Sequence, residues 1–100
     1  MVKLHLNNKD LQLIKDILVK HVPHHEIWAY GSRLKGDNHE ASDLDLVIRN
    51  PQDLTKACGQ LSQLKQAFSE SELPIFVDVM DWAHLPDGFK QEINQCHVRL

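Results

Sequence analysis

The amino-acid sequence predicts an α/β or α+β sandwich, in which helices cover a small β-sheet. The chain has 100 residues, enough for one domain with one modest hydrophobic core. Its composition is 42% hydrophobic and 25% charged with few glycines and prolines, which is typical of a globular protein. Segments with the periodicity of helices and strands follow one another in the order helix, strand, strand, helix, strand, helix. We therefore expect residues 1–100 to form a single domain.

The first helix is predicted over residues 8–22, with Asn7 or Asn8 as its N-cap and Pro23 ending it. Its apolar positions fall near helical spacing: Leu11, Ile14, Leu18 and Val22. Residues 26–30 form an apolar run that is too short for a helix and rich in aromatic and branched residues. This run is typical of a strand buried on both faces, and we expect it to stop at Gly31.

The second strand is predicted over residues 43–48, where polar and apolar residues alternate. The alternation sends three apolar side chains to one face: Leu44, Leu46 and Ile48. Asp43 and Asp45 therefore share the other face.

A second long helix is predicted from Asn50 to about Ser69, because Asn50 can act as a cap and Pro51 suits the first helical position. Its apolar stripe would consist of Leu54, Ala57, Leu61, Leu64 and Phe68. A third strand is predicted over residues 75–80, and a last helix over residues 86–96.

Charge and cysteine content exclude several classes of function. The formal net charge of −3 argues against tight, nonspecific binding of nucleic acid, which requires Lys and Arg to neutralise phosphates. Cys58 and Cys96 lack CxxC spacing and no signal-like segment opens the chain, so we expect a cytoplasmic protein. The apolar runs are far shorter than the roughly 20 residues of a membrane-spanning helix.

The informative residues surround the end of the first strand and the start of the second. Gly31 lets the backbone approach an anion closely, and Ser32 can donate its hydroxyl and amide to phosphate oxygens. Two carboxylates at i and i+2 on a strand, Asp43 and Asp45, project in parallel. Mg²⁺ prefers one or two such ligands together with water and substrate phosphates. The sequence thus predicts half of a phosphate site and half of a metal site.

Asp78 stands inside the third apolar strand, between Val77 and Val79. A buried carboxylate there is costly unless it is paired, hydrogen-bonded or bound to a metal. It could complete the site if the two strands are neighbours. Three carboxylates with two metal ions could stabilise an in-line displacement at the α-phosphorus of a nucleotide, with Asp78 orienting or deprotonating the attacking hydroxyl.

This pattern of Gly-Ser, ten residues, Asp-x-Asp and a later strand aspartate resembles the signature of the DNA polymerase β-type nucleotidyltransferase superfamily. Within the superfamily, the chain is similar to the minimal nucleotidyltransferases, the antitoxin partners of HEPN-domain ribonucleases. The similarity rests on Gly31-Ser32-Arg33, Lys35-Gly36 and residues 42–46, and it extends over nearly the whole chain.

The resemblance implies a mixed sheet of three to five strands, with Asp43, Asp45 and Asp78 as the metal-binding acidic residues. Gly31 and Ser32 would bind the triphosphate of ATP, and two Mg²⁺ ions would assist. Family members transfer AMP to a tyrosine of a cognate HEPN toxin, so the resemblance implies a hetero-oligomeric partner that brings the acceptor.

Other interpretations of the same residues stay open at this stage. The chain could neutralise its partner by tight binding alone, or it could be a small-molecule adenylyltransferase whose acceptor pocket is completed by a homodimer. Arg33 and Lys35 could contact phosphates or be solvated loop charges. The histidines at positions 21, 24 and 25 lack partners at an established zinc-ligand spacing, so we interpret them as surface residues.

Overall fold

The structure, a computed structural model, describes residues 4–35 and 43–100 and contains a mixed four-stranded sheet with the strand order β3-β2-β1-β4. Strand β1 (Glu26–Tyr30) pairs antiparallel with β2 (Leu44–Arg49) and with the short β4 (Val98–Arg99). Strand β3 (Val77–Asp81) pairs parallel with β2. The predicted α+β class and mixed sheet are confirmed.

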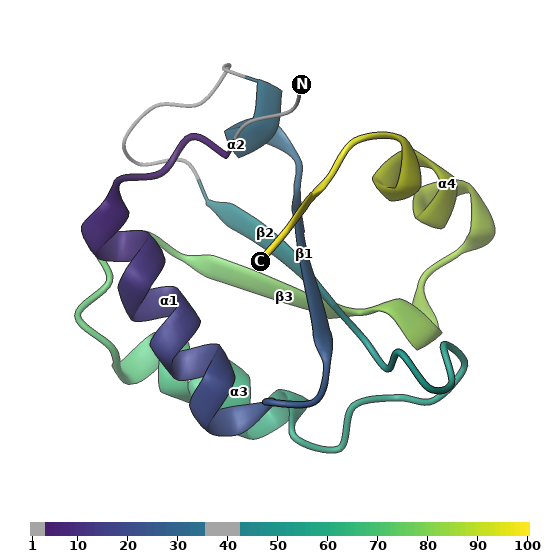
Figure 1. Ribbon diagram of the computed structural model, residues 1–100, viewed down its shortest axis with the longest axis horizontal. Coiled ribbons are helices and arrows are strands. Elements are labelled where there is room, and N and C mark those ends of the chain that lie inside the picture. Colours follow the sequence, from purple (N-terminus) through teal and green to yellow (C-terminus); the bar gives the residue numbers. More distant parts are fainter. Residues whose placement is uncertain (1–3, 36–42) are drawn as a thin grey trace.

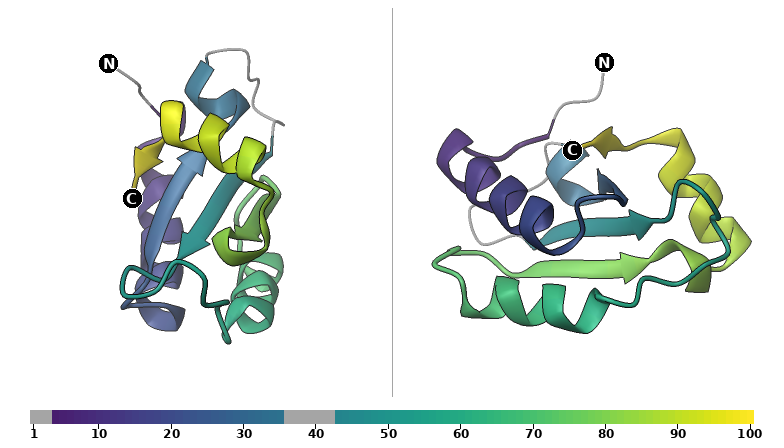
Figure 2. Two further views of the ribbon diagram at one scale, coloured as in Figure 1. Left: turned by 90° about the vertical axis from the view of Figure 1, so that its right-hand side faces the viewer. Right: turned by 60° about the horizontal axis from the view of Figure 1, so that its bottom comes forward.

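Helices cover both faces of the sheet (Figures 1 and 2). Helices α1 (Asn8–His21) and α3 (Leu61–Glu70) lie side by side on one face, and α4 (Asp87–Gln95) lies on the other. The one-turn helix α2 (Ser32–Lys35) follows directly from the end of β1.

The main core lies between the sheet and the α1–α3 layer. It is built from side chains of the predicted apolar faces: Ile14, Leu18, Ile27, Ala29, Leu44, Leu46, Ile48, Leu64, Phe68, Val77 and Val79. Strands β1, β2 and β3 contribute alternate residues to this core, as strand periodicity requires. The intervening residues therefore point to the face that carries α4.

A second, smaller cluster fixes α4 to that face. Trp28 packs edge-on against Trp82 with ring centroids 5.6 Å apart, and it stacks on His97 at 3.8 Å. The Arg49 guanidinium lies over both indole rings, 3.7 Å from the Trp28 centroid and 4.4 Å from that of Trp82. Glu26 forms a salt bridge with Arg49 at 3.4 Å. Cation–π contacts of this kind add stability at partly desolvated sites, so they hold Trp82 against the sheet, and Ile93 of α4 packs into the same cluster.

The first helix agrees closely with its prediction. Asn7 is the N-cap, and its side-chain oxygen accepts a hydrogen bond from the Asp10 amide. The last helical residue is His21, just before Val22 and Pro23. The short side chain at the cap and the proline after the end act as helix signals.

The predicted helix from Asn50 to Ser69 is wrong in its first half, because residues 50–60 form turns and α3 begins only at Leu61. The Asn50 side chain accepts from the Gln52 amide, and Asp53 accepts from both the amide and the hydroxyl of Thr55. Such local bonds offer the backbone an alternative to the helical pattern. The first two residues of the proposed stripe, Leu54 and Ala57, are accordingly exposed.

The strands are displaced slightly from their predicted bounds, and two short elements were not predicted. Strand β2 runs from Leu44 to Arg49, and β3 begins at Val77 rather than at residue 75. The unpredicted elements are the 3₁₀ turn η1 (Trp82–His84) and β4. Asp81 caps η1 as the N-cap, with its carboxylate accepting from the Ala83 amide at 3.3 Å.

Asp81 also fixes the irregular segment to the sheet. Its other carboxylate oxygen accepts a hydrogen bond from the Cys58 amide at 2.7 Å, across 23 positions of sequence. Asp81 is only 6% exposed, and Cys58 belongs to the main core. This bond therefore joins the residues before α3 to the end of β3.

No helix within residues 4–35 and 43–100 is both long enough and apolar enough to cross a lipid bilayer.

Replacing Asp81 by alanine should destabilise the fold by about 2–3 kcal/mol, because it leaves the buried Cys58 amide without its acceptor. Urea unfolding of Asp81→Ala against the parent chain measures the loss. Asp53→Ala is the matched control, since Asp53 bonds only within an exposed turn of the same segment. Equal stability of the two variants would contradict the role of Asp81.

Candidate active site

Three polar side chains form a row across the sheet on the face that carries α4. Tyr30 on β1 is the cross-strand partner of Asp45 on β2, and Asp45 is in turn the register partner of Asp78 on β3. Residues in register on adjacent strands point to the same face. The register thus brings together the two carboxylates that the sequence placed on separate strands.

The backbone at the end of β1 approaches the same row. Gly31 has φ +88°, a conformation that L side chains rarely adopt. A Cβ atom on Gly31 would lie 2.5 Å from Oδ2 of Asp45, so a side chain cannot fit there without displacing the carboxylate. Glycine at this position therefore lets the strand end and the Asp45 carboxylate lie in contact.

The other predicted site residues lie around this row. Ser32 begins α2 directly after Gly31 and is half-buried. Asp43 is exposed and immediately precedes β2, two residues from Asp45. The segment between them includes residues 36–42, with Gly36 and Ser42 of the proposed motif, and lies outside the described residues.

Arg33 has a structural role in α2. It is 6% exposed, and its guanidinium donates to the His5 carbonyl at 3.0 Å. The Arg33 carbonyl accepts from the His5 amide at 2.7 Å, so Arg33 holds the segment before α1 against α2. Its expected contact with phosphate stays a prediction. Lys35 is the last residue of α2, and its side chain lies outside the described part.

Asp78 is less buried than the sequence argument assumed. It is half-buried rather than enclosed, and β3 is an edge strand of the sheet. The cost of burying a charge is therefore a weaker argument for its role than its position. Asp78 stands in register with Asp45, and this is what brings it into the site.

The charges of the row act on Asp45. Burial raises the pKa of the Asp45 carboxyl, and the nearby carboxylates of Asp78 and Asp43 raise it further. Within residues 4–35 and 43–100, neither Asp45 nor Asp78 takes part in a salt bridge. Like charges held on adjacent strands repel each other, so a cation between them would stabilise the ionised pair.

The donor set fits a hard, oxygen-preferring cation that keeps other ligands. Among the described residues, no three His, Cys, Asp or Glu side chains are arranged to enclose a metal. Mg²⁺ does not need such a cage, because it is usually held by one or two carboxylates with water and substrate phosphates. Asp45 and Asp78, with Asp43 beside them, are consistent with that mode of binding.

Tyr30 is a residue of the row that the sequence argument missed. Burial raises the pKa of Tyr30 to about 12, with further contributions from Asp45 and Asp78. Its ring packs edge-on against Phe89 of α4, with centroids 5.7 Å apart. Its alternation with Trp28 was visible in the sequence, but only the antiparallel register places it opposite Asp45.

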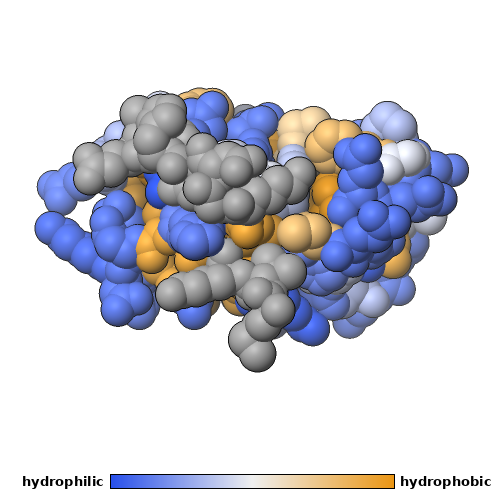
Figure 3. Space-filling view, turned by 90° about the horizontal axis from the view of Figure 1, so that it is seen from above, coloured by the Kyte–Doolittle hydropathy of each residue, from blue (hydrophilic) through white to orange (hydrophobic). Residues whose placement is uncertain are grey.

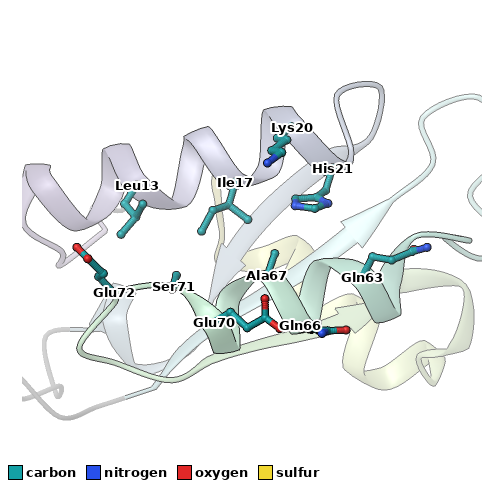
Figure 4. Close-up of a pocket in the computed structure, with 10 residues that line it drawn as sticks. All are labelled: Leu13, Ile17, Lys20, His21, Gln63, Gln66, Ala67, Glu70, Ser71 and Glu72. Atoms are coloured by element: carbon teal, nitrogen blue, oxygen red, sulfur yellow. Dashed lines mark hydrogen bonds between the residues drawn. The ribbon is translucent and has the colours of Figure 1, made fainter.

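Apolar residues come to the surface beside this end of the sheet. Figure 3 views the molecule from the side of α2, and there apolar residues lie between hydrophilic residues at either end of the view. A separate groove of about 620 Å³ lies between α1 and α3, with Leu13 and Ile17 pointing from α1 toward α3 (Figure 4). It belongs to the opposite layer from the acidic row and is not part of this site.

We predict that Asp45→Asn stabilises the ligand-free protein. With its raised pKa, Asp45 favours the fold only while protonated, so the parent chain loses stability as pH rises through that pKa. Removing one of two like charges in register should gain about 0.5 kcal/mol at neutral pH, or roughly 2–4 °C in Tm. Thermal unfolding in EDTA measures the gain. The exposed Asp16 supplies the control, because Asp16→Asn should give none.

A second prediction concerns the ionisation of Tyr30, the only tyrosine of the chain. Tyrosinate absorbance should titrate well above pH 10 in the folded protein, and Asp45→Asn should lower the midpoint only in part because burial is the main cause. Folding is correspondingly weakened as pH rises from 10 to about 12. If the titration midpoint of Tyr30 in the folded chain were near pH 10 and equal to that in denaturant, Tyr30 would be neither buried nor close to the carboxylates of Asp45 and Asp78.

Comparison with known proteins identifies the family of the chain. Residues 12–100 match the family described as polymerase beta, nucleotidyltransferase. A relative from Haemophilus influenzae, described as "Probable protein adenylyltransferase MntA", is 40% identical over 96 residues, which are 96% of this chain and 82% of the relative. A crystal structure of a toxin–antitoxin with AMP-PNP has the same fold, with a TM-score of 0.70 and 21% identity over 94% of this chain and 72% of that one. The chain therefore belongs to the polymerase beta nucleotidyltransferase family and is a nucleotidyltransferase.

Proposed function

We propose that this nucleotidyltransferase uses Mg²⁺ to transfer AMP from ATP to a hydroxyl, most simply a tyrosine, of a HEPN-type toxin and so acts as an antitoxin. The observation that carries the proposal is the contact between Gly31 and Asp45, with Asp78 in register beside them. It joins a backbone suited to phosphates with carboxylates suited to a metal. The relative described as a protein adenylyltransferase and the toxin–antitoxin with AMP-PNP support the same substrate classes.

In this proposal each residue of the site has a separate task. Gly31 and Ser32 hold the β- and γ-phosphates through backbone amides and the serine hydroxyl. Asp43, Asp45 and Asp78 would hold one or two Mg²⁺ ions, which neutralise charge on the reacting phosphates when bound.

The transfer is an in-line displacement at the α-phosphorus. The acceptor oxygen forms the new bond to phosphorus, the bond from phosphorus to the bridging oxygen of pyrophosphate breaks, and pyrophosphate leaves. Asp78 receives the hydroxyl proton or orients it toward water. Because Asp78 is half-buried on the edge strand β3, an acceptor carried by another protein can reach it.

The experiment is to incubate the chain with α-labelled ATP, Mg²⁺ and a HEPN-type partner, and to follow label on the partner. Asp43→Asn with Asp45→Asn should lower the transfer rate at least about a hundredfold, because the site loses most of its charge stabilisation. The exposed residues Asp16 and Asp53 provide a charge-matched double variant, which should keep the parental rate. Equal labelling of the partner by both double variants would contradict the role of Asp43 and Asp45 in AMP transfer.

Two other outcomes identify different functions. If the Asp43, Asp45 variant neutralises the partner as well as the parent chain does, the protein acts by binding alone. If small hydroxylated molecules are modified and the protein partner is not, the acceptor is a small molecule. Either result contradicts the proposed transfer to a toxin.

A further inference from the structure

A cavity of about 230 Å³ adjoins the acidic row on the side of α4. It lies between the end of β1 and the face of α4, lined by Tyr30, Gly31, Phe89, Glu92, Ile93 and Cys96. Gly31 belongs to this wall and also contacts Asp45. The cavity therefore shares Tyr30 and Gly31 with the site described above and adjoins it.

Its size and position limit what it can bind. Pockets that enclose a whole drug-sized ligand measure about 300–1,000 Å³, so this cavity suits one ring system rather than a complete nucleotide. In an in-line displacement the acceptor and the leaving pyrophosphate lie on opposite sides of the phosphorus. With pyrophosphate at Gly31 and the acceptor at Asp78, a cavity that touches Gly31 is on the wrong side for the acceptor. The nucleoside remains as the occupant.

The walls offer the chemistry that a nucleobase needs. The rings of Tyr30 and Phe89 meet edge-on at 89°, which fixes the Phe89 ring although it is 38% exposed. Phe89 has no role in either hydrophobic cluster, whereas Ile93 on the next turn of α4 is buried in the second one. The α4 helix thus holds an aromatic ring over the site without using it in the core. Base–aromatic stacking is a large, sequence-tolerant source of affinity for nucleotides.

Among the residues that the structure describes, Glu92 is the only charged one in this wall. An ionised carboxylate only accepts hydrogen bonds, so it favours a base that presents donors. An exocyclic amino group, as on adenine, is such a donor. Glu92 is exposed, so a base without such a donor would leave its carboxylate hydrated and gain no hydrogen bond from it.

We propose that this cavity is the nucleobase site, in which Phe89 stacks on the ring and Glu92 selects an amino-bearing base such as adenine. The inference rests on the proposed function, because it takes the phosphates to lie at Gly31. It adds the source of base preference, which neither the motif nor the metal site determines.

The test separates base binding from phosphate binding. Affinities for Mg-ATP and for Mg-tripolyphosphate are measured by calorimetry on the parent chain and on Phe89→Ala. We expect Phe89→Ala to weaken ATP binding about tenfold to a hundredfold and to leave tripolyphosphate binding unchanged. Phe76→Ala is the matched control, because Phe76 is 64% exposed and lies outside the cavity. It should bind both ligands as the parent does.

Cys96 provides a readout that needs no substitution. Its thiol lines the cavity and is partly exposed, whereas Cys58 is buried and burial raises the pKa of the Cys58 thiol. Alkylation should therefore start at Cys96. Mg-ATP should slow it, and Mg-tripolyphosphate should not.

Base selection is tested with purine riboside triphosphate, which lacks the amino group. The parent chain should prefer ATP, and Glu92→Ala should remove that preference. Phe89→Ala that weakens neither ligand, or both equally, overturns the nucleobase site. The nucleobase site can be wrong while the proposed function is right. That is the conclusion if Phe89→Ala has no selective effect but the Asp43→Asn, Asp45→Asn double variant still abolishes AMP transfer. Unchanged transfer by the aspartate variant would instead remove the proposed function itself.

Discussion

The parallel register of β2 and β3 is the constraint on which the site depends. It places Asp45 and Asp78, 33 positions apart in sequence, side by side on one face. The same alternation sends Leu44, Leu46 and Val79 into the core behind them. A shift of one residue in either strand would bury the carboxylates and expose the core residues, so packing and chemistry enforce the same pairing.

Much of the fold could be predicted because burial leaves periodic traces in the sequence. The strand alternation around Asp45 gave the correct face for each residue, and the cap at Asn7 gave the correct start of α1. Gly31, Asp45 and Asp78 were predicted as site residues because their types and spacing suit phosphate and metal, and the structure places them close together, while their roles stay a prediction. Sequence reasoning succeeded for features that depend on a single helix or strand, such as its start or the face to which a side chain points.

Sequence reasoning failed where turns or contacts with distant segments determine the local structure. Residues 50–60 have a helical pattern, but local turns and the bond from the Cys58 amide to Asp81 hold them in another shape. The two-residue strand β4 has no periodicity to detect and exists through pairing with β1. Tyr30 and Phe89 became part of the site only once the register and the packing of α4 were known.

The position of Tyr30 bears on whether the enzyme could modify a tyrosine of its own chain. Its hydroxyl is the only phenol that the chain possesses, and Tyr30 lies in register with Asp45 on the neighbouring strand. Burial and the carboxylates of Asp45 and Asp78 keep that hydroxyl protonated, with a pKa of about 12. A tyrosine that ionises less readily than usual and whose ring is held by Phe89 would, under the proposed function, be a poorer acceptor than a tyrosine brought by a partner.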